Sequence, residues 1–164
     1  KSKTCRAPTR QKRTYNSKLE TRNPKLLRMT INRLQSWLLR LTGATEILAF
    51  FSVVMPRSWM EVSHSWLGLG EMPEGPIIMF MIRQASYVYG MHGVSLWLLA
   101  TDVKRYQPLI VFNGISFLLA GLVFFLIDYS AGLPTWWTIV DSFGCASFGV
   151  AVLLLSWLRR KSIQ

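Results

Sequence analysis

Five ionisable side chains lie inside apolar stretches of the sequence: Arg40, Glu46, Arg83, His92 and Asp141. Arg40 is near the cytoplasmic end of its segment, where its side chain can reach the headgroups. Ionisable groups are costly inside a bilayer, so each needs a partner or a functional reason. A helical rise of about 1.5 Å per residue places Glu46 about 13 Å, Arg83 about 9 Å and Asp141 about 7 Å below one membrane edge. An arginine between two carboxylates satisfies all three groups. We therefore predict an intramembrane polar cluster of Glu46, Arg83 and Asp141, with a structural role favoured over a polar site open to the outer face.

His92 lies deeper, at about 22 Å by the same helical rise, with Gly90 and Gly93 beside it. A buried histidine can ligate haem iron, hydrogen-bond a quinone or pigment, or bond a neighbouring helix. Haem held by two histidines needs both at similar depth, and His64 lies in an expected outer loop. We favour a structural histidine, keep a quinone or pigment contact as the alternative, and rank metal or haem ligation last.

Catalytic chemistry has little support in the sequence. There is no G-x-S-x-G, H-E-x-x-H or Walker motif. Glu61, Ser63 and His64 are spaced so that they do not share one helix face. Cys5 and Cys145 form neither a disulfide framework nor a metal site. We predict no catalytic residue, no metal and no resident cofactor, so a non-enzymatic protein is favoured over an enzyme.

Four apolar segments of about membrane length must position these residues: 37–55, 77–100, 109–127 and 136–158. Pro56, Pro76 and Pro108 stand at three of their ends, where proline fits a helix boundary. The predicted fold is therefore all-α, an integral membrane bundle of four transmembrane helices.

The loops predict the direction of these helices, because Lys and Arg concentrate on the cytoplasmic side. The loop at 102–106 carries Lys104 and Arg105, and the C-terminal segment has three basic residues after Leu158. The loops at 56–76 and 128–135 are poor in basic residues. This alternation predicts a multi-pass protein with both termini in the cytoplasm.

The first outer loop contains an expected short amphipathic helix that lies in the membrane interface. Trp59 and Trp66 recur there at helical spacing, with His64 and other polar residues between them. Trp136 and Trp137 form a second aromatic anchor at the same membrane surface. Such an interfacial helix can also serve as a docking surface.

The N-terminal 33 residues are basic and polar, and are expected to form a disordered leader before the membrane domain at 34–164. Twelve of the nineteen Lys and Arg residues lie at or before Arg40, which suits anionic lipid headgroups better than nucleic acid. The leader lacks the apolar core of a secretory signal. Met29 is a natural start, so residues 1–28 are treated as disordered or non-native.

Several strings resemble a family of small four-span bacterial membrane proteins of the kind found in planctomycetes. They are W-L-G-L-G-E-M-P-E-G-P-I at 66–77, Y-G-M-H-G at 89–93, D-V-K-R-Y-Q-P-L-I at 102–110 and I-D-Y-S-A-G-L-P-T-W-W at 127–137. The resemblance covers residues 35–158 and implies a bacterial inner-membrane four-helix protein. It implies no catalytic residues, and it favours a start near Met29.

The expected function is that of a non-enzymatic accessory or structural subunit in a larger membrane assembly. The expected partners are the lipid bilayer, other membrane proteins or further copies of the chain, and no nucleic acid. A small redox or ligand-binding protein that contacts quinone, pigment or haem through His92 is the alternative. A small transporter or proton pathway ranks third.

Overall fold

The computed structural model describes residues 24–161, and these residues form helices joined by short connections, without any strand. The helices are α2 (Pro24–Ile47), α3 (Phe50–Val54), α4 (Arg57–Trp66), α5 (Pro76–Thr101), α6 (Gln107–Ala131) and α7 (Thr135–Lys161). The all-α prediction is confirmed for this part of the chain. Residues 1–23 of the expected leader lie outside the described residues.

The N-terminal boundary differs from the prediction, because α2 begins at Pro24 instead of near residue 34. Ile31, which belonged to the expected disordered leader, is buried. Residues 24–33 are thus helical, and Ile31 extends the packed face of α2, whereas Leu26, Leu27 and Met29 are exposed.

Three helical stretches are long and apolar enough to cross a membrane: Leu26–Val54, Gln107–Ala131 and Thr135–Lys161. Their outward faces carry large exposed apolar side chains, among them Phe112, Leu119 and Leu122 on α6. Soluble monomers rarely expose apolar patches of this kind. The chain therefore has the length and composition of a membrane protein. The helix α5 has 26 residues but does not belong to this set, because Arg83, Gln84 and His92 interrupt its apolar sequence.

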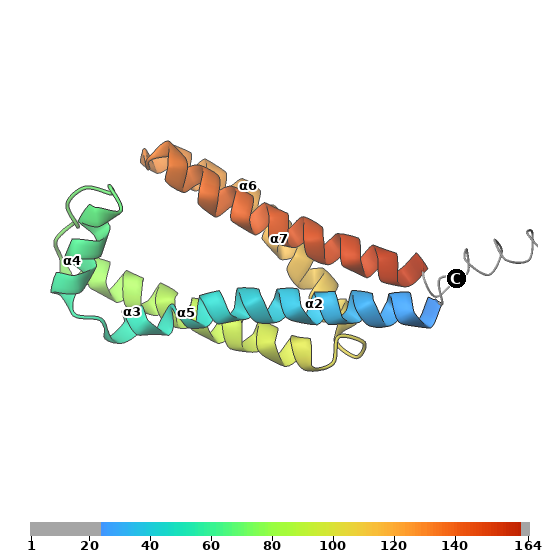
Figure 1. The fold of residues 1–164 in the computed structure, drawn as a ribbon. Coiled ribbons are helices and arrows are strands. Elements are labelled where there is room, and N and C mark those ends of the chain that lie inside the picture. Colours follow the sequence, from blue (N-terminus) through green and yellow to red (C-terminus); the bar gives the residue numbers. More distant parts are fainter. Residues whose placement is uncertain (1–23, 162–164) are drawn as a thin grey trace, which may run out of the picture.

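The helices pair into two hairpins. One hairpin combines α2 and α3 with α5, the other combines α6 with α7, and a smaller contact between α2 and α7 joins them. Figure 1 shows the hairpins close together near the loop between α5 and α6, and diverging toward the end where α4 lies. Both ends of the described chain lie at the end opposite α4 (Figure 1).

Glycines allow the helices of each hairpin to approach closely. A Cβ atom on Gly93 of α5 would lie 2.6 Å from the carbonyl oxygen of Gly43 on α2. A Cβ atom on Gly149 of α7 would lie 2.7 Å from the carbonyl oxygen of Gly114 on α6. Both distances are too short for a real side chain, so these contacts require glycine. Small residues at helix crossings are the usual means of close packing in membranes.

The first helix is broken shortly after Glu46. The turn Leu48–Ala49 separates α2 from α3, and here the amides of Ala49 and Phe51 bond the carbonyls three residues back. The tighter turn redirects α3 along α5, where the ring of Phe50 fills the space left by Gly90. The expected single segment 37–55 is therefore two helices.

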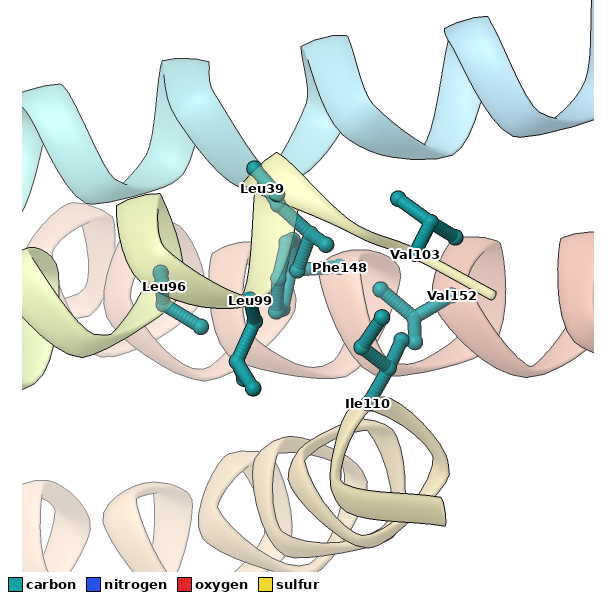
Figure 2. Packing of buried hydrophobic residues seen from close by; sticks show 8 residues of the cluster. Leu39, Leu96, Leu99, Val103, Ile110, Phe148 and Val152 are labelled. Atoms are coloured by element: carbon teal, nitrogen blue, oxygen red, sulfur yellow. The ribbon is translucent and has the colours of Figure 1, made fainter. Parts of the chain in front are cut away.

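A small apolar core joins the two hairpins. Figure 2 shows its side chains meeting from all four long helices and from the loop after α5. The buried members are Leu39, Leu96, Leu99, Ala100, Val103, Ile110, Phe148 and Val152. This core lies toward the closed end of the structure, which is the end near the loop between α5 and α6. Between the core and the end where α4 lies, the hairpins are held together mainly by polar and aromatic contacts near His92.

Candidate functional site

His92 on α5 is held on both sides by polar side chains from the neighbouring helices. Its Nδ1 lies 2.6 Å from Oε2 of Glu46 on α2, and its Nε2 lies 2.9 Å from Oδ1 of Asn113 on α6. The side chain of Glu46 is 12% exposed and that of His92 is 34% exposed. The three residues thus form a partly buried polar chain that runs from one hairpin to the other.

The glycine crossing places Glu46 beside His92. A Cβ atom on Gly93 would meet the Cβ atom of Glu46 at 2.9 Å, so the backbones of α2 and α5 touch next to the histidine. The carboxylate of Glu46 then reaches the imidazole directly. The break at Leu48–Ala49 follows immediately and leaves room for α3 to turn along α5.

Asn113 is fixed in its orientation by its own helix. Its Nδ2 donates to the backbone carbonyl of Leu109 at 3.0 Å, and a carbonyl can only accept. The side-chain oxygen of Asn113 therefore faces His92, and Nε2 of His92 must carry the proton of that bond. Both ring nitrogens are engaged inside the protein, so a metal or haem ligand would first have to break one of these two bonds.

Aromatic contacts continue the chain from His92 into the core. The ring of His92 packs against Phe117 on α6 at a centroid distance of 5.6 Å. Phe117 in turn packs edge-on against the core residue Phe148 on α7 at 4.6 Å. The contacts of His92 thus continue through α6 to α7.

A cavity of about 240 Å³ opens beside the histidine, between the two hairpins. All four long helices contribute to its wall. Among the lining residues are Tyr89, Phe117, Ala120, Phe124 and Cys145. An apolar cavity of about 150 Å³ can hold benzene, so this space is large enough for a single ring or a segment of a hydrocarbon chain.

The residues of the predicted polar cluster are found at separate places in the described structure. Glu46 is paired with His92, whereas Arg83 is exposed and lines a groove with Val53 and Phe80. Asp141 is half-buried on α7. It lies within electrostatic range of Asp128 on α6, whose Oδ2 has no hydrogen-bond partner in the described part of the chain. The structure therefore brings none of the three residues together with another.

The short helix predicted in the first outer loop is α4. Its residues Trp59 and Trp66 are exposed, and Trp59 also packs against Phe51 of α3. His64 donates from Nδ1 to the carbonyl of Gly70 at 3.0 Å and so holds the loop that follows. The Glu61 carboxylate accepts a hydrogen bond from Arg57 at 2.6 Å and raises the pKa of Arg57.

The second predicted anchor lies at the start of α7. Trp136 and Trp137 pack edge-on at 5.5 Å. They stand in the first turn of α7, and this end of α7 lies on the same side of the molecule as α4 (Figure 1). Both aromatic groups are thus at the end where the hairpins diverge.

Two polar features were not anticipated. Asn113 is neutral and was not considered together with the ionisable residues, although a lone asparagine in an apolar helix is a recognisable signal. The second feature is a network at the closed end, where Gln35 of α2 and Gln107 of α6 both donate to Oγ of Ser156 on α7, at 3.0 and 2.7 Å. Arg159 bonds the carbonyl of Val103 and the side chain of Gln107 in the same network.

The candidate site is therefore the chain Glu46–His92–Asn113 with the adjoining apolar cavity. Comparisons of the sequence and structure with protein-family models, with curated proteins and with solved structures find no match. The chemistry of the site has to be argued from its own residues.

Proposed function

We propose that the chain is a non-enzymatic integral membrane protein that acts as an accessory or structural subunit of a larger membrane assembly. The observation that carries this proposal is the double engagement of His92, whose two ring nitrogens both bond the protein itself. The polar groups inside the apolar region thus hold helices together. The described residues also place little mass beyond the ends of the long helices, which favours a function exerted through partners within the membrane.

In this proposal α5 crosses the membrane together with α2, α6 and α7, giving four spans. Its length of 26 residues is sufficient, and it packs along α2. The basic residues Lys104, Arg105, Arg160 and Lys161 then face the cytoplasm and anionic headgroups. The exposed tryptophans of α4 lie in the outer interface. The resemblance described above makes a bacterial inner membrane the proposed location.

The crossing of α5 can be tested with two single-cysteine variants, Ser65→Cys and Lys104→Cys, in a background of Cys5→Ser and Cys145→Ala. A membrane-impermeant thiol reagent applied to oriented spheroplasts should label Ser65→Cys only, and Lys104→Cys should react after lysis. Labelling of both sites from the outside would refute the four-span topology.

The subunit role is tested by mild extraction at native expression, with quantitative mass spectrometry of the proteins that accompany the chain. We expect a stoichiometric membrane partner. The side chains of Arg83 and Trp66 are exposed, so Arg83→Ala and Trp66→Ala should weaken the retention of a partner that contacts them. His92→Gln should instead reduce the amount of folded protein. A lone chain or a pure homo-oligomer would contradict an accessory role in a larger assembly.

A second candidate is a small ligand-binding or redox protein, and the cavity of about 240 Å³ beside His92 favours it. A quinone ring or pigment fits a space of this size. An absorbance band or an extracted quinone in the purified chain, lost in Ala120→Phe, would establish this function. Ala120 lines the cavity, so the larger side chain fills it.

A further inference from the structure

We propose that Glu46 and His92 form a binding site for a single proton, and that this proton decides whether the two hairpins are joined through Asn113. The imidazole ring of His92 makes two hydrogen bonds, one from each nitrogen. The bond to Glu46 lies within the hairpin of α2 and α5, and the bond to Asn113 reaches the other hairpin. This inference goes beyond the proposed subunit role, because it gives the site a ligand of its own.

The number of protons shared by Glu46, His92 and Asn113 follows from which of their atoms donate and which accept. Nε2 of His92 must donate to Asn113, because the amide of Asn113 is oriented by the carbonyl of Leu109. The bond between Nδ1 and Glu46 needs a second proton, carried either by the ring as imidazolium or by the carboxyl group. In both forms the pair of Glu46 and His92 has no net charge.

When the pair of Glu46 and His92 loses one proton, its net charge becomes −1. The imidazole then has one proton, and both the carboxylate of Glu46 and the side-chain oxygen of Asn113 could accept it. The released proton passes to a water at the mouth of the cavity, and only N–H and O–H bonds change. A charge-assisted bond to a carboxylate is about twice as strong as a neutral bond, so the remaining proton moves to Nδ1. Nε2 then presents a lone pair to the oxygen of Asn113, and the bond between the hairpins is lost. Rotation of the Asn113 amide would instead place its oxygen against the carbonyl of Leu109.

Among the residues that the structure describes, those lining the cavity include no lysine or arginine that could replace the proton. The cavity wall contributed by α6 consists of Ser116, Phe117, Ala120 and Phe124, which do not titrate. The other titratable groups nearby are Tyr89 on α5 with Cys145 and Asp141 on α7, and none of them is cationic. An unprotonated pair would therefore be an uncompensated negative charge in an apolar space, which is costly.

The sign of the pH dependence follows directly. The link between the hairpins contains the proton, so it is present at lower pH and is lost as the pH rises. A further proton at acid pH leaves both bonds in place, because an imidazolium donates from both nitrogens and a neutral carboxyl still accepts. The bond between the hairpins through Asn113 is thus lost only on the alkaline side of the transition, while the apolar core still joins them at the other end.

The proton site can be tested by ¹⁵N NMR of the imidazole in lipid nanodiscs. The chain has two histidines, so His64→Gln leaves His92 as the sole signal. We expect Nε2 to be protonated below the transition, and to lose its proton above it while Nδ1 keeps one. In Glu46→Gln the side-chain amide can donate to Nδ1 without ionising, so Nε2 should stay protonated at every pH. Nε2 that remains protonated throughout, or a titration that is unchanged in Glu46→Gln, would overturn the proposal.

Coupling to the hairpins is tested by electron–electron spin distance measurements. Val54 on α3 and Tyr129 on α6 are exposed and lie on different hairpins. Spin labels at Val54→Cys and Tyr129→Cys, with Cys5→Ser and Cys145→Ala, should show a longer and broader distance above the transition. The distance should stay short in Glu46→Gln and long at all pH values in Asn113→Leu. A distance distribution that does not change across the pH transition seen by NMR would refute the link between the proton and the hairpins.

Discussion

Replacing Gly93 by alanine should separate α2 from α5 and weaken the hydrogen bond between Glu46 and His92. The added Cβ would lie 2.6 Å from the carbonyl oxygen of Gly43 and 2.9 Å from the Cβ of Glu46. These atoms must retreat to about 3.4 Å, the lower limit of ordinary contact. The hydrogen bond of 2.6 Å between Glu46 and His92 would lengthen by a similar amount. The bond would then measure about 3.1–3.4 Å, at or beyond the long end of the usual range, and would be weakened.

The expected cost can be built from three contributions. Overpacking costs about 1–3 kcal/mol. Loss of an interhelical polar contact in a membrane protein adds on average about 0.6 kcal/mol, and at most about 1.7. Alanine recovers up to about 1 kcal/mol through its better helix propensity. Gly93→Ala should therefore lower the free energy of unfolding by about 1–3 kcal/mol, with overpacking as the main cause.

The matched control is Gly144→Ala on α7. A Cβ atom on Gly144 meets nothing within 4 Å, so the same chemical change should be neutral or stabilising there. Unfolding in lipid–detergent micelles, followed by circular dichroism against the mole fraction of dodecyl sulfate, compares the two variants. If Gly93→Ala unfolds at the same point as Gly144→Ala, the close crossing at Gly93 is refuted.

Three further changes test other parts of the structure by the same unfolding assay. Phe148→Ala should cost about 3 kcal/mol because the ring is buried in the core, whereas Phe143→Ala, at an exposed ring, should be nearly neutral; equal effects would contradict the core. Asp128→Asn should stabilise the protein by about 1 kcal/mol, since it removes a buried charge close to another carboxylate; a loss of stability would show that the carboxylate is needed. Ser156→Ala should cost about 1 kcal/mol by orphaning two glutamine donors, while Ser147→Ala, at an exposed hydroxyl that bonds only its own helix, should not.

The ends of the helices could be predicted where the sequence contains a strong boundary signal. The segment expected at 77–100 is α5 (Pro76–Thr101), because Pro76 opens it and the polar residues from Asp102 onward close it. The start of α2 could not be found in this way. Arg28 and Arg33 make this segment resemble the basic leader in sequence, and only the structure shows that Ile31 is buried.

The site could be predicted only as a set of candidate residues. Depth along a helix can be counted from the sequence, but the direction in which a side chain points depends on the crossing of the helices. Glu46 and His92 were assigned depths that differ by about 9 Å, yet they touch at 2.6 Å. The contact between Gly43 and Gly93 sets how far α2 and α5 are shifted along one another. A count of helical rise that places every helix perpendicular to the membrane cannot include this shift.

The modest apolarity of α5 bears on how the protein enters the bilayer. The three strongly apolar stretches can partition into lipid on their own, whereas a helix that carries Arg83, Gln84 and His92 gains less from insertion. In the proposed four-span topology, such a segment is held in the bilayer by its partners, and the bond from Glu46 of α2 to His92 is one of these contacts. A ribosome-released fragment ending after Thr101 would then be an early target for membrane quality control.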